Sequence, residues 1–570
     1  MNQTRSFLLI AWLMVAALLW MEWNRSNSAV VPATTPAATA SNNSPASLPA
    51  LSATPASALP APLQAAPATS QQTVAARPLV IGNDMLRLTV DPRGGRIIDS
   101  QLLQYTVEKK PGSPNVHLLN TDPAQYYVAD AGLITVGAGN AQNELPLDFH
   151  VENGGDNFLL APGAPAVSVP LVWTDPSTGI TVRRTLTLKR GSYVLELRDQ
   201  VSNAGAAPQT LYPFVQLSRV EPPAPPKHSF MTNPETFSFV GGAWHTPEDN
   251  YAKAKFSEFG VKQPTASKEA AGVWLAMLQH HFVTAWVPSS DEKQLLHTSV
   301  GRQGGVPLFQ LRSVATPLQL APNSSQTHQS RLWVGPKLQA PLAGLEPNLD
   351  LTVDYGKLSV IARPLYWLLA QLHLLFGNWG WAIIAIVVLL KAALYPLSAK
   401  QYQSMAKMRS VQPRLEALKE RYGDDKQQYN VAMMELYKKE KINPIGGCLP
   451  MLIPIPIFLG LYWVLLETVE LRHAPWIGWI QNLTAADPYF ILPALNLLVM
   501  FLTQKLSPTP GMDPMQKKMM QFMPLVFGVM MAFFPAGLVL YWVTNGALGL
   551  AQQWWMTRRH GPKSPVVVAR

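Results

Sequence analysis

The chain has 570 residues, of which 48% are hydrophobic, and a formal net charge of +10 at neutral pH. The apolar residues are concentrated in a few dense blocks. This composition is typical of a membrane protein with soluble parts and excludes a chain that is soluble throughout. The single cysteine, Cys448, excludes an internal disulfide framework.

The positive charge is confined to three segments. Residues 399–448, 505–522 and 556–570 contain the whole excess of Lys and Arg over Asp and Glu, so the remainder of the chain is neutral overall. The basic balance therefore gives no sign of DNA binding. By the positive-inside rule, all three segments are predicted to be cytoplasmic.

The first predicted membrane segment lies near the N-terminus. Residues 7–20 form the apolar run FLLIAWLMVAALLW, and the apolar stretch extends to Trp23. Small residues at 26–29 offer a cleavage site, so one hypothesis is a secretory signal peptide. A retained signal anchor over residues 1–28 is favoured because aromatic residues flank the stretch. Either interpretation exports the residues that follow.

A linker and a β-rich domain are predicted next. Residues 29–76 contain no charged residue and are dominated by Ala, Pro, Ser and Thr, which is typical of an extended, semi-rigid linker. Residues 77–345 alternate short runs of Val, Leu, Thr and aromatic residues with Gly, Pro, Asn and Asp turns. This pattern predicts a large β-sandwich, with tight turns at residues 94–95 and 190–191.

Two features of the sequence concern a bound metal or nucleotide. His280 and His281 are adjacent, but neighbouring residues on a strand face opposite ways, so metal ligation is not predicted. The sequence contains no Gly-rich phosphate loop with its Lys-Ser/Thr. The sequence therefore predicts no metal site and no cofactor.

The pattern becomes helical from residue 355. Pro364 is expected in the first turn of a helix, where proline is tolerated. Residues 358–398 are about twice the ~20 residues needed to cross a bilayer. We therefore predict a periplasmic helix lying along the interface at residues 346–378 and a second span at residues 379–398.

The second span contains Lys391 about two-thirds of the way along, followed by Pro396. A bare ammonium at such depth costs roughly 2.5 to 3.5 kcal/mol on insertion scales. In one interpretation, the stem of Lys391 extends to the headgroups. In the other, the ammonium lines a water-filled groove between helices. The segment alone leaves both open.

Residues 399–448 are predicted to form a cytoplasmic helical hairpin. Apolar residues recur at spacings of three and four, Gly423 can end the first helix, and Asp424 can cap the second. The basic hairpin is interpreted either as a solvated loop near anionic lipid or as a docking surface. Its candidate contacts to a client or partner are Met405, Met408, Tyr429 and Met433.

Two further spans and a second cytoplasmic loop follow. The third span is predicted at residues 449–469 and the fourth at residues 489–506. The second cytoplasmic loop, residues 507–522, contributes the candidate contacts Met515, Lys517 and Lys518, because Met adapts to varied apolar helices.

The last apolar block, residues 523–556, has basic residues at both ends. As one helix it would be about 50 Å long, well beyond a ~30 Å core, so a hairpin of two spans fits better. Its turn is expected at residues 534–537. The basic tail, residues 557–570, is then cytoplasmic, and parity gives six spans with both termini cytoplasmic.

Long motifs occur in one order after residue 77. They are GVWLAMLQHHFVTAWVP, Lys391 with Tyr395-Pro396-Leu397, SMAKMRSVQPRLEALKERYGDDKQ, NPIGGCLPMLIPIPIFLGLYW, DPMQKKMMQFMP and FPAGLVLYW. In this combination the chain resembles the YidC-type membrane protein insertases of Gram-negative bacteria. The resemblance is specific because the motifs are long and ordered.

The resemblance implies a polytopic α-helical membrane protein with a five-helix core behind an N-terminal anchor. It also implies a large periplasmic β-super-sandwich, similar to galactose mutarotases but without known catalysis. A hydrophilic groove is implied, whose positive charge, usually Arg, falls on Lys391. Lys keeps the charge but lacks the planar fork of Arg.

Other groove positions also follow from the resemblance. Pro396, Tyr541 and Trp542 are implied to line or support the groove. One polar position of relatives is Val387 here, one turn before the charge. The remaining polar lining is not predicted.

The implied function is a membrane protein insertase and chaperone of the bacterial inner membrane, and not an enzyme. It inserts and helps fold inner-membrane proteins, alone or with the Sec translocon, through the hydrophilic groove. The expected partners are nascent membrane proteins, Sec translocon components, membrane lipids, the ribosome and a targeting factor, but not DNA. The protein is expected to be multi-pass, with both termini cytoplasmic if the first span is retained.

Two alternatives belong to other classes. An ion- or proton-coupled secondary transporter would use Lys391 in its site, but no paired repeats are evident, and Glu467 is expected near the opposite end of its helix. A membrane-tethered carbohydrate enzyme rests on the β domain alone. Deleting that domain would inactivate such an enzyme but leave an insertase working.

Overall fold

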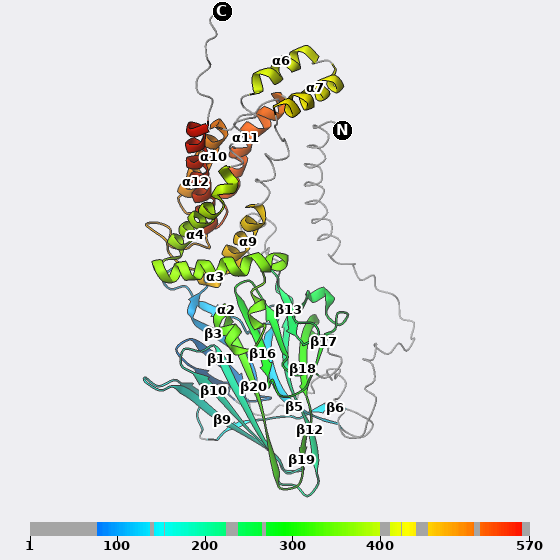
Figure 1. The fold of residues 1–570 in the computed structure, drawn as a ribbon. Coiled ribbons are helices and arrows are strands. Elements are labelled where there is room, and N and C mark those ends of the chain that lie inside the picture. Colours follow the sequence, from blue (N-terminus) through cyan, green and yellow to red (C-terminus); the bar gives the residue numbers. More distant parts are fainter. Residues whose placement is uncertain are drawn as a thin grey trace, which may run out of the picture. The chain divides into compact units, whose positions relative to one another are not determined.

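The computed structural model describes residues 77–136, 142–152, 154–223, 238–264, 270–399, 411–422, 425–440, 454–506 and 514–560. These residues form a β-rich domain followed by a helical region (Figure 1). The expected signal anchor, residues 1–28, and the linker, residues 29–76, lie outside the described residues.

The β domain contains two sheets. In chain order their strands are β1 (Leu79–Gly82), β2 (Leu86–Asp91), β3 (Arg96–Thr106), β4 (Asn115–His117), β5 (Tyr127–Val136), β6 (Gln142–Glu144), β7 (His150–Val151), β8 (Asn157–Leu159), β9 (Ala166–Asp175), β10 (Ile180–Lys189), β11 (Val194–Asn203), β12 (Gln209–Val220), β13 (Gly241–His245), β14 (Ala252–Ala254), β15 (Trp274–Leu278), β16 (Phe282–Pro288), β17 (Gln294–Gln303), β18 (Val306–Ala315), β19 (Leu318–Leu320) and β20 (Ser324–Pro336).

The predicted β-sandwich is confirmed. One sheet has 11 strands, with the order β17-β18-β12-β5-β3-β2-β1-β8 along its main path, and the other has nine, in the order β14-β13-β15-β16-β20-β11-β10-β9-β7. Strand β10 shows why they stack: Ile180, Val182, Leu186 and Leu188 alternate with more exposed residues and enter one common core. An apolar face repeating every second residue must pack on another sheet.

Both predicted turns are confirmed. Strands β2 and β3 pair antiparallel around Gly94 and Gly95, whose φ angles of +80° and +63° favour glycine. Strands β10 and β11 pair antiparallel around Gly191, at φ +67°.

One ion pair lies inside the sandwich. Arg184 of β10 stands opposite Asp199 of β11 and donates to both carboxylate oxygens, at 2.8 and 2.7 Å. Its third contact is the carbonyl oxygen of Ala131, at 2.9 Å. Because each buried charge has a partner, the pair joins the two sheets without an orphaned charge.

The helical region begins with α2 (Gln339–Leu345) and continues with α3 (Ser359–Phe376), α4 (Trp379–Ala393), α6 (Gln412–Tyr422), α7 (Lys426–Lys439), α9 (Pro454–Glu467), α10 (Ile491–Leu506), α11 (Pro514–Met531) and α12 (Ala536–His560). By length and composition, α3 is the one described helix that reaches the size and apolarity of a membrane-spanning helix. Shorter apolar helices occupy Trp379–Ala393, Ile455–Glu467, Ile491–Lys505 and Gln521–Met531.

Prolines act differently in α3 and after α4. Pro364 lies inside α3 and not in its first turn, because the helix starts earlier, at Ser359. The helix of Lys391 is interrupted at Leu394 and resumes at residues 395–399. Pro396 explains this interruption, since it has no N–H to donate to residue 392 and its ring disfavours a straight continuation.

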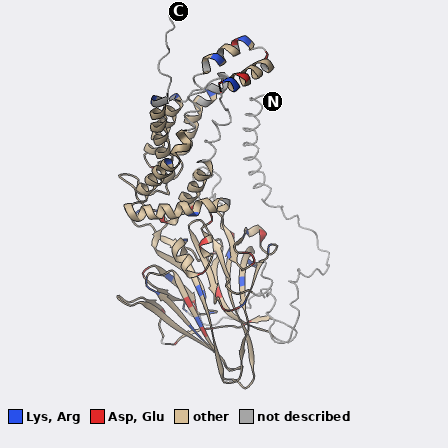
Figure 2. Cartoon of the chain, viewed as in Figure 1, with Lys and Arg blue, Asp and Glu red and all other residues tan. Residues whose placement is uncertain are grey.

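The hairpin of α6 and α7 has a small core of its own, formed by Val411, Leu415, Met433 and Tyr437. Its second helix is capped by Asp425 and not by Asp424. The carboxylate of Asp425 accepts from the backbone N–H groups of Gln427 and Gln428, at 2.9 and 3.0 Å. Figure 2 shows several Lys and Arg residues on this hairpin, whereas α4 and α9 are almost free of charged residues.

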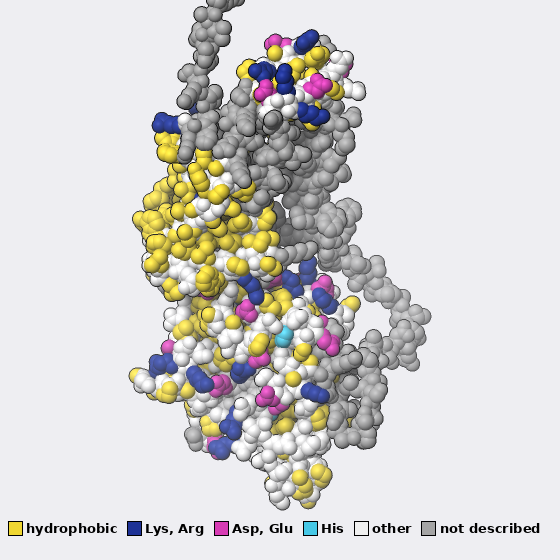
Figure 3. Space-filling model, in the orientation of Figure 1, with side chains coloured by type: hydrophobic (Ala, Val, Ile, Leu, Met, Phe, Trp, Pro, Cys, Tyr) yellow, Lys and Arg dark blue, Asp and Glu magenta, His cyan; other side chains and the backbone are white. Residues whose placement is uncertain are grey.

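Helical structure extends into the segment predicted as the second cytoplasmic loop. Helix α11 begins at Pro514, so residues 514–522 are helical and not loop. Helices α11 and α12 are separated by a short turn after Met531, close to the expected turn. The visible surface of the helical region is largely hydrophobic (Figure 3).

Helices α3, α4, α9 and α12 share one apolar core. Small residues allow close approach: a Cβ on Gly546 of α12 would lie 2.8 Å from Cγ1 of Val499 on α10. The loop between α9 and α10 is also hydrogen-bonded to the start of α12. There, Ala536 N–H donates to Ala485 O at 2.7 Å, and Gly537 N–H donates to Leu483 O at 2.8 Å.

Candidate functional site

Lys391 lies in the last turn of α4 and is partly buried. Its ammonium faces α12 at Gly549, where a Cβ would lie 3.5 Å from Nζ. None of the ion pairs found among the described residues includes Lys391. The charge of α4 therefore lies against α12, at a glycine that adds no side chain of its own.

The face of α12 that contains Gly549 is partly polar. Trp542, Asn545, Gly549 and Gln552 follow one another at three, four and three residues, so they share one side of the helix. All four are partly buried. The Nε2 of Gln552 is buried and has no hydrogen-bond partner within the described part of the chain. Amide side chains thus lie one turn before and one turn after the glycine that meets Lys391.

The two amides were missed by sequence reasoning. The signal available for them was weak: Asn545 and Gln552 are seven residues apart in an otherwise apolar helix. Without the position of Gly549 against Lys391, nothing in the sequence links that spacing to the charge on another helix.

The aromatic residues predicted for the groove lie farther along α12. Tyr541 is buried and packs edge-on against Phe458 of α9, with ring centroids 5.6 Å apart. Trp542 stacks on the same ring at 6.4 Å. Because Tyr541 precedes Gly549 by eight residues, about 12 Å of helix separates them. The aromatic pair therefore joins α12 to α9 and does not contact the Lys391 ammonium.

The other predicted groove positions are also placed. Val387 is buried in the shared helical core, which explains how an apolar side chain is accepted one turn before Lys391. Pro396 is exposed and follows the interruption at Leu394. Its structural effect is to break α4 just after the charge.

The predicted contacts on the cytoplasmic segments divide into three groups. Met405 and Met408 lie outside the described residues, as do the side chains of Met515 and Lys517. Tyr429 and Met433 pack in the core of the hairpin, where they support its shape. Lys518 is exposed, but on α11 and not in a loop. Exposed apolar residues of α7 that the sequence analysis missed are Val431 and Met434.

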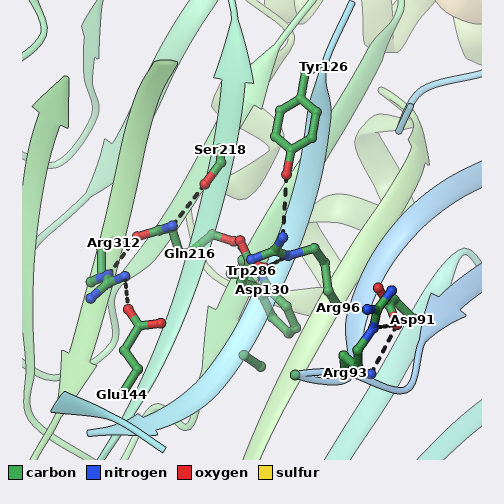
Figure 4. Close-up of polar contacts among 12 residues, drawn as sticks. Asp91, Arg93, Arg96, Tyr126, Asp130, Glu144, Gln216, Ser218, Trp286 and Arg312 are labelled. Carbon is green, nitrogen blue, oxygen red and sulfur yellow. Dashed lines mark hydrogen bonds and ion pairs between the residues drawn. The ribbon is translucent and has the colours of Figure 1, made fainter. Parts of the chain in front are cut away.

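A second polar cluster crosses the 11-stranded sheet. The backbone register places Asp130 opposite Gln216, Gln216 opposite Arg312, and Arg312 opposite His297. Figure 4 shows Asp130, Gln216 and Arg312 of this row beside Arg96, which is paired with Asp130. Burial is the main cause that lowers the pKa of His297 to about 3.

The charges of this row are matched internally. Arg312 donates to Gln216 Oε1 and to Glu144 Oε1, both at 2.6 Å. Gln216 donates in turn to Ser218 Oγ at 2.8 Å. Each guanidinium in the row has a carboxylate partner, so the row ties neighbouring strands together through charge-assisted hydrogen bonds.

The prediction that His280 and His281 lie on a strand and face opposite ways is wrong. They lie in the turn between β15 and β16, and not in a strand, so their rings do not face opposite ways. The rings stack at 3.7 Å, and both Nε2 atoms approach the carbonyl oxygen of Leu466, at 3.0 and 3.2 Å. No cluster of three or more possible metal ligands occurs among the residues that the structure describes.

Together, these features define a class of protein: a membrane protein whose apolar helices enclose a lysine and whose chain includes a large β-sandwich. Two family models match the chain. The model described as 60Kd inner membrane protein matches residues 371–563, and that described as YidC periplasmic domain matches residues 78–368.

Relatives of nearly equal length agree with these models. The chain is 52% identical to the membrane protein insertase YidC of Stenotrophomonas maltophilia strain R551-3, over 98% of this chain and 97% of the relative. It is 49% identical to the protein of that name from Xanthomonas campestris pv. campestris strain ATCC 33913, over 100% of this chain and 99% of the relative. The chain therefore belongs to the YidC family and is an inner-membrane protein.

A solved structure is also similar. It is a crystal structure of an active YidC insertase with the first transmembrane domain resolved, 17% identical, covering 84% of this chain and 92% of that chain, with a TM-score of 0.36. The family assignment rests on the family models and the relatives. The relatives' shared name favours the insertase hypothesis over the transporter alternative.

Proposed function

We propose that this protein inserts nascent membrane proteins into the bacterial inner membrane and helps them fold, with Lys391 and the polar face of α12 receiving the client's polar tail. The observation that carries the proposal is the position of Lys391: a cation between membrane helices, beside Gly549, without an ion-pair partner among the described residues. Membership of a family whose curated members are named insertases supports it.

The physical reason is the cost of moving a polar tail through hydrocarbon. Isolated charges and unsatisfied backbone groups are expensive in a ~30 Å apolar core. A polar face that extends over part of that depth shortens the dry path, and the ammonium of Lys391 offsets the burial of acidic residues in the tail. The client's own apolar helix then leaves into lipid, so no nucleotide is required.

We infer six spans: the N-terminal anchor, followed by a five-helix core made of α4, α9, α10, α11 and α12. Helix α3 lies along the periplasmic interface in this arrangement, with Trp367 and Leu374 among its exposed apolar residues. Both termini and the hairpin of α6 and α7 are cytoplasmic by the positive-inside rule.

The inferred topology can be tested by cysteine labelling after Cys448 is replaced by Ser. Ala536 at the α11–α12 turn is unsuitable because it is fully buried, whereas Phe533 is 42% exposed. In intact cells, a membrane-impermeant thiol reagent should label Phe533→Cys but not Lys518→Cys. Permeabilised cells provide the control, in which both should react. Labelling of Lys518→Cys in intact cells would overturn the parity argument.

We infer that the cytoplasmic hairpin receives clients and contacts the ribosome or a targeting factor, and that Sec translocon components act with the protein on some clients. The exposed residues Val431 and Met434 on α7 suit apolar contacts, and the basic charge of the segment suits acidic partners or anionic lipid equally. Stalled ribosomes bearing a short client should crosslink to probes at these two positions. The docking role should be abandoned if both probes contact only lipid while insertion proceeds normally.

The function itself can be tested by depletion of the host insertase and expression of this chain. The chain should restore growth and the protease-protected state of a client's translocated tail. Deletion of the β domain provides a second comparison, since an insertase core should retain activity that a carbohydrate enzyme would lose. Failure of the full chain to protect any client tail would refute the proposed function.

A further inference from the structure

The outer end of α9 is held by the β domain through a buried ion pair. Glu467 is the last residue of α9, and its Oε1 accepts from Ser238 Oγ at 2.7 Å. Its Oε2 lies 3.9 Å from Nζ of Lys337, which directly follows β20. The side chains of Lys337 and Glu467 are 1% and 2% exposed, so neither charge is solvated by bulk water.

The same helix end receives two histidines. His280 and His281 both direct Nε2 to the carbonyl oxygen of Leu466, one residue before Glu467. The N–H of Lys337 donates to the carbonyl of His281 at 2.9 Å, so the histidine turn and the lysine form one unit. Three separate stretches of the β domain, at Ser238, at the histidine turn and at Lys337, thus converge on the last turn of α9.

A second attachment holds the loop after α9. Lys109, in the turn between β3 and β4, donates to the carbonyls of His473 and Gln481, at 2.6 and 2.5 Å. Arg472 donates in return to the carbonyl of Val107 at 3.0 Å. The loop that these contacts hold is the one whose Leu483 and Ala485 carbonyls accept from the first residues of α12.

We propose that Lys337 and Glu467 are positioning residues: their ion pair fixes the outer end of α9 and, through the following loop, the start of α12. Helix α12 contains the face that meets Lys391, so the β domain sets the geometry of that face from a distance. Only this last step rests on the proposed function. The clamp, by which we mean the attachment of the β domain to the end of α9 through Lys337 and Glu467, depends only on the contacts described above.

The proposal predicts a characteristic energetic coupling. Removing one partner of a buried ion pair leaves an uncompensated charge in a dry site, whereas replacing both partners by apolar side chains is far less harmful. We call the contact of the β domain with the end of α9 and the following loop the junction. The variants Lys337→Met and Glu467→Met should therefore each loosen the junction, and the double variant should restore its packing.

A reporter of the junction is Ile480, which lies in the held loop and is fully buried. The experiment uses the purified full-length protein in detergent, with Cys448→Ser and Ile480→Cys, and measures the rate of maleimide labelling. Each single Met variant should raise the rate about tenfold or more, while the double variant should stay within about threefold of the parent. The exposed pair Lys189 and Glu196, replaced by Met in the same way, should leave the rate unchanged.

Three outcomes decide the matter. Strong coupling between the two substitutions supports the clamp. Single variants that label like the parent overturn it, and so do single effects that simply multiply in the double variant. If Glu467→Met fails to accumulate, Glu467→Gln keeps a group that can accept from Ser238 and should still accelerate labelling about threefold.

Client insertion by the same variants in cells separates this inference from the proposed function. A parent protein that inserts no client refutes the function while leaving the clamp intact. A parent that inserts clients normally, together with uncoupled labelling rates, refutes the clamp alone.

Discussion

Lys337 and Lys391 are both withdrawn from bulk solvent, but their surroundings differ. Lys337 is almost completely buried between a β strand and a helix end, with Glu467 3.9 Å away. Lys391 is only partly buried, lies against Gly549, and has amide-bearing residues before and after that contact along α12. Burial is the main cause that lowers the pKa of Lys337, and Glu467 opposes that shift.

The difference indicates two uses of a cation. A buried charge that is already paired is occupied by its own structure and has little to offer a ligand. A cation beside a glycine and neutral amides keeps its field available to an incoming carboxylate. Substitutions should therefore respond differently at the two positions: the identity of the partner should matter at Lys337, and the sign of the charge should matter at Lys391.

The largest effect is expected for charge reversal at Lys391. The variant Lys391→Glu should slow insertion of clients with acidic translocated tails by roughly tenfold or more, because a repulsion of about 1.4 kcal/mol already corresponds to tenfold in rate. Lys391→Arg should keep most activity, since the charge is retained. Depletion of the host insertase, complementation with each variant and protease protection of the client tail provide the measurement.

The matched comparison is Lys391→Leu, which removes the charge without reversing it and should fall between Arg and Glu. A client with a neutral tail serves as the control, because its insertion should depend less on the sign. Equal rescue by the Glu and Arg variants would falsify the electrostatic role and make Lys391 resemble a purely structural lysine.

A smaller effect, of a few fold, is expected when the amides near Lys391 are removed. Asn545→Leu and Gln552→Leu make the α12 face apolar and should slow insertion without reducing stability. For Gln552 the reason is specific: its buried Nε2 has no hydrogen-bond partner among described residues, so its loss leaves no described donor or acceptor orphaned.

The control for this pair is Ala547→Leu. Ala547 is exposed and lies two residues from Gly549, on the opposite side of α12. Insertion rate and thermal unfolding should be measured on the same preparations. If the control slows insertion as much as the amide variants do, the polarity of the Lys391 face is irrelevant.

The sequence predicted the sandwich well because its signals are local. The alternation of apolar residues occurs within single strands, as in β10, and the glycines of a turn are adjacent in the sequence, as at Gly94 and Gly95. The predictions were less accurate for the ends of helices, which depend on contacts with neighbouring elements. The N-cap of α7 is Asp425, one residue later than expected, and α11 begins well before the predicted end of the second loop.

The candidate site was less predictable because it depends on contacts between distant segments. Lys391 stood out as a charge in an apolar helix, but its approach to Gly549 joins residues far apart in the chain. The histidine pair is a second case in which contacts with a distant segment were not predictable from the sequence. Strand geometry predicted rings facing apart, whereas the turn stacks them and both approach Leu466, a residue of α9.

The smallest expected effect is the pH dependence of stability at the junction that contains Lys337, which has no counterpart at Lys391. Burial is the main cause that lowers the pKa of His280 to about 3 and that of His281 well below its usual range. An unfolded histidine, with a pKa near 6.5, takes up a proton that the folded protein excludes. Stability is therefore fully present above about pH 6.5 and falls as the pH drops toward 3, by up to about 1.4 kcal/mol per pH unit for each histidine.

The double variant His280→Asn/His281→Asn should flatten this acid dependence, because an amide can donate a hydrogen bond but does not titrate. The measurement is the thermal midpoint of β-sandwich unfolding, followed by circular dichroism of the full chain between pH 7 and pH 5. At Lys391, a Lys391→Leu variant should leave the slope as it is, since no histidine contacts that site among the described residues. An unchanged slope in the histidine variant would show that the neutral pair contributes nothing to the acid sensitivity of the junction.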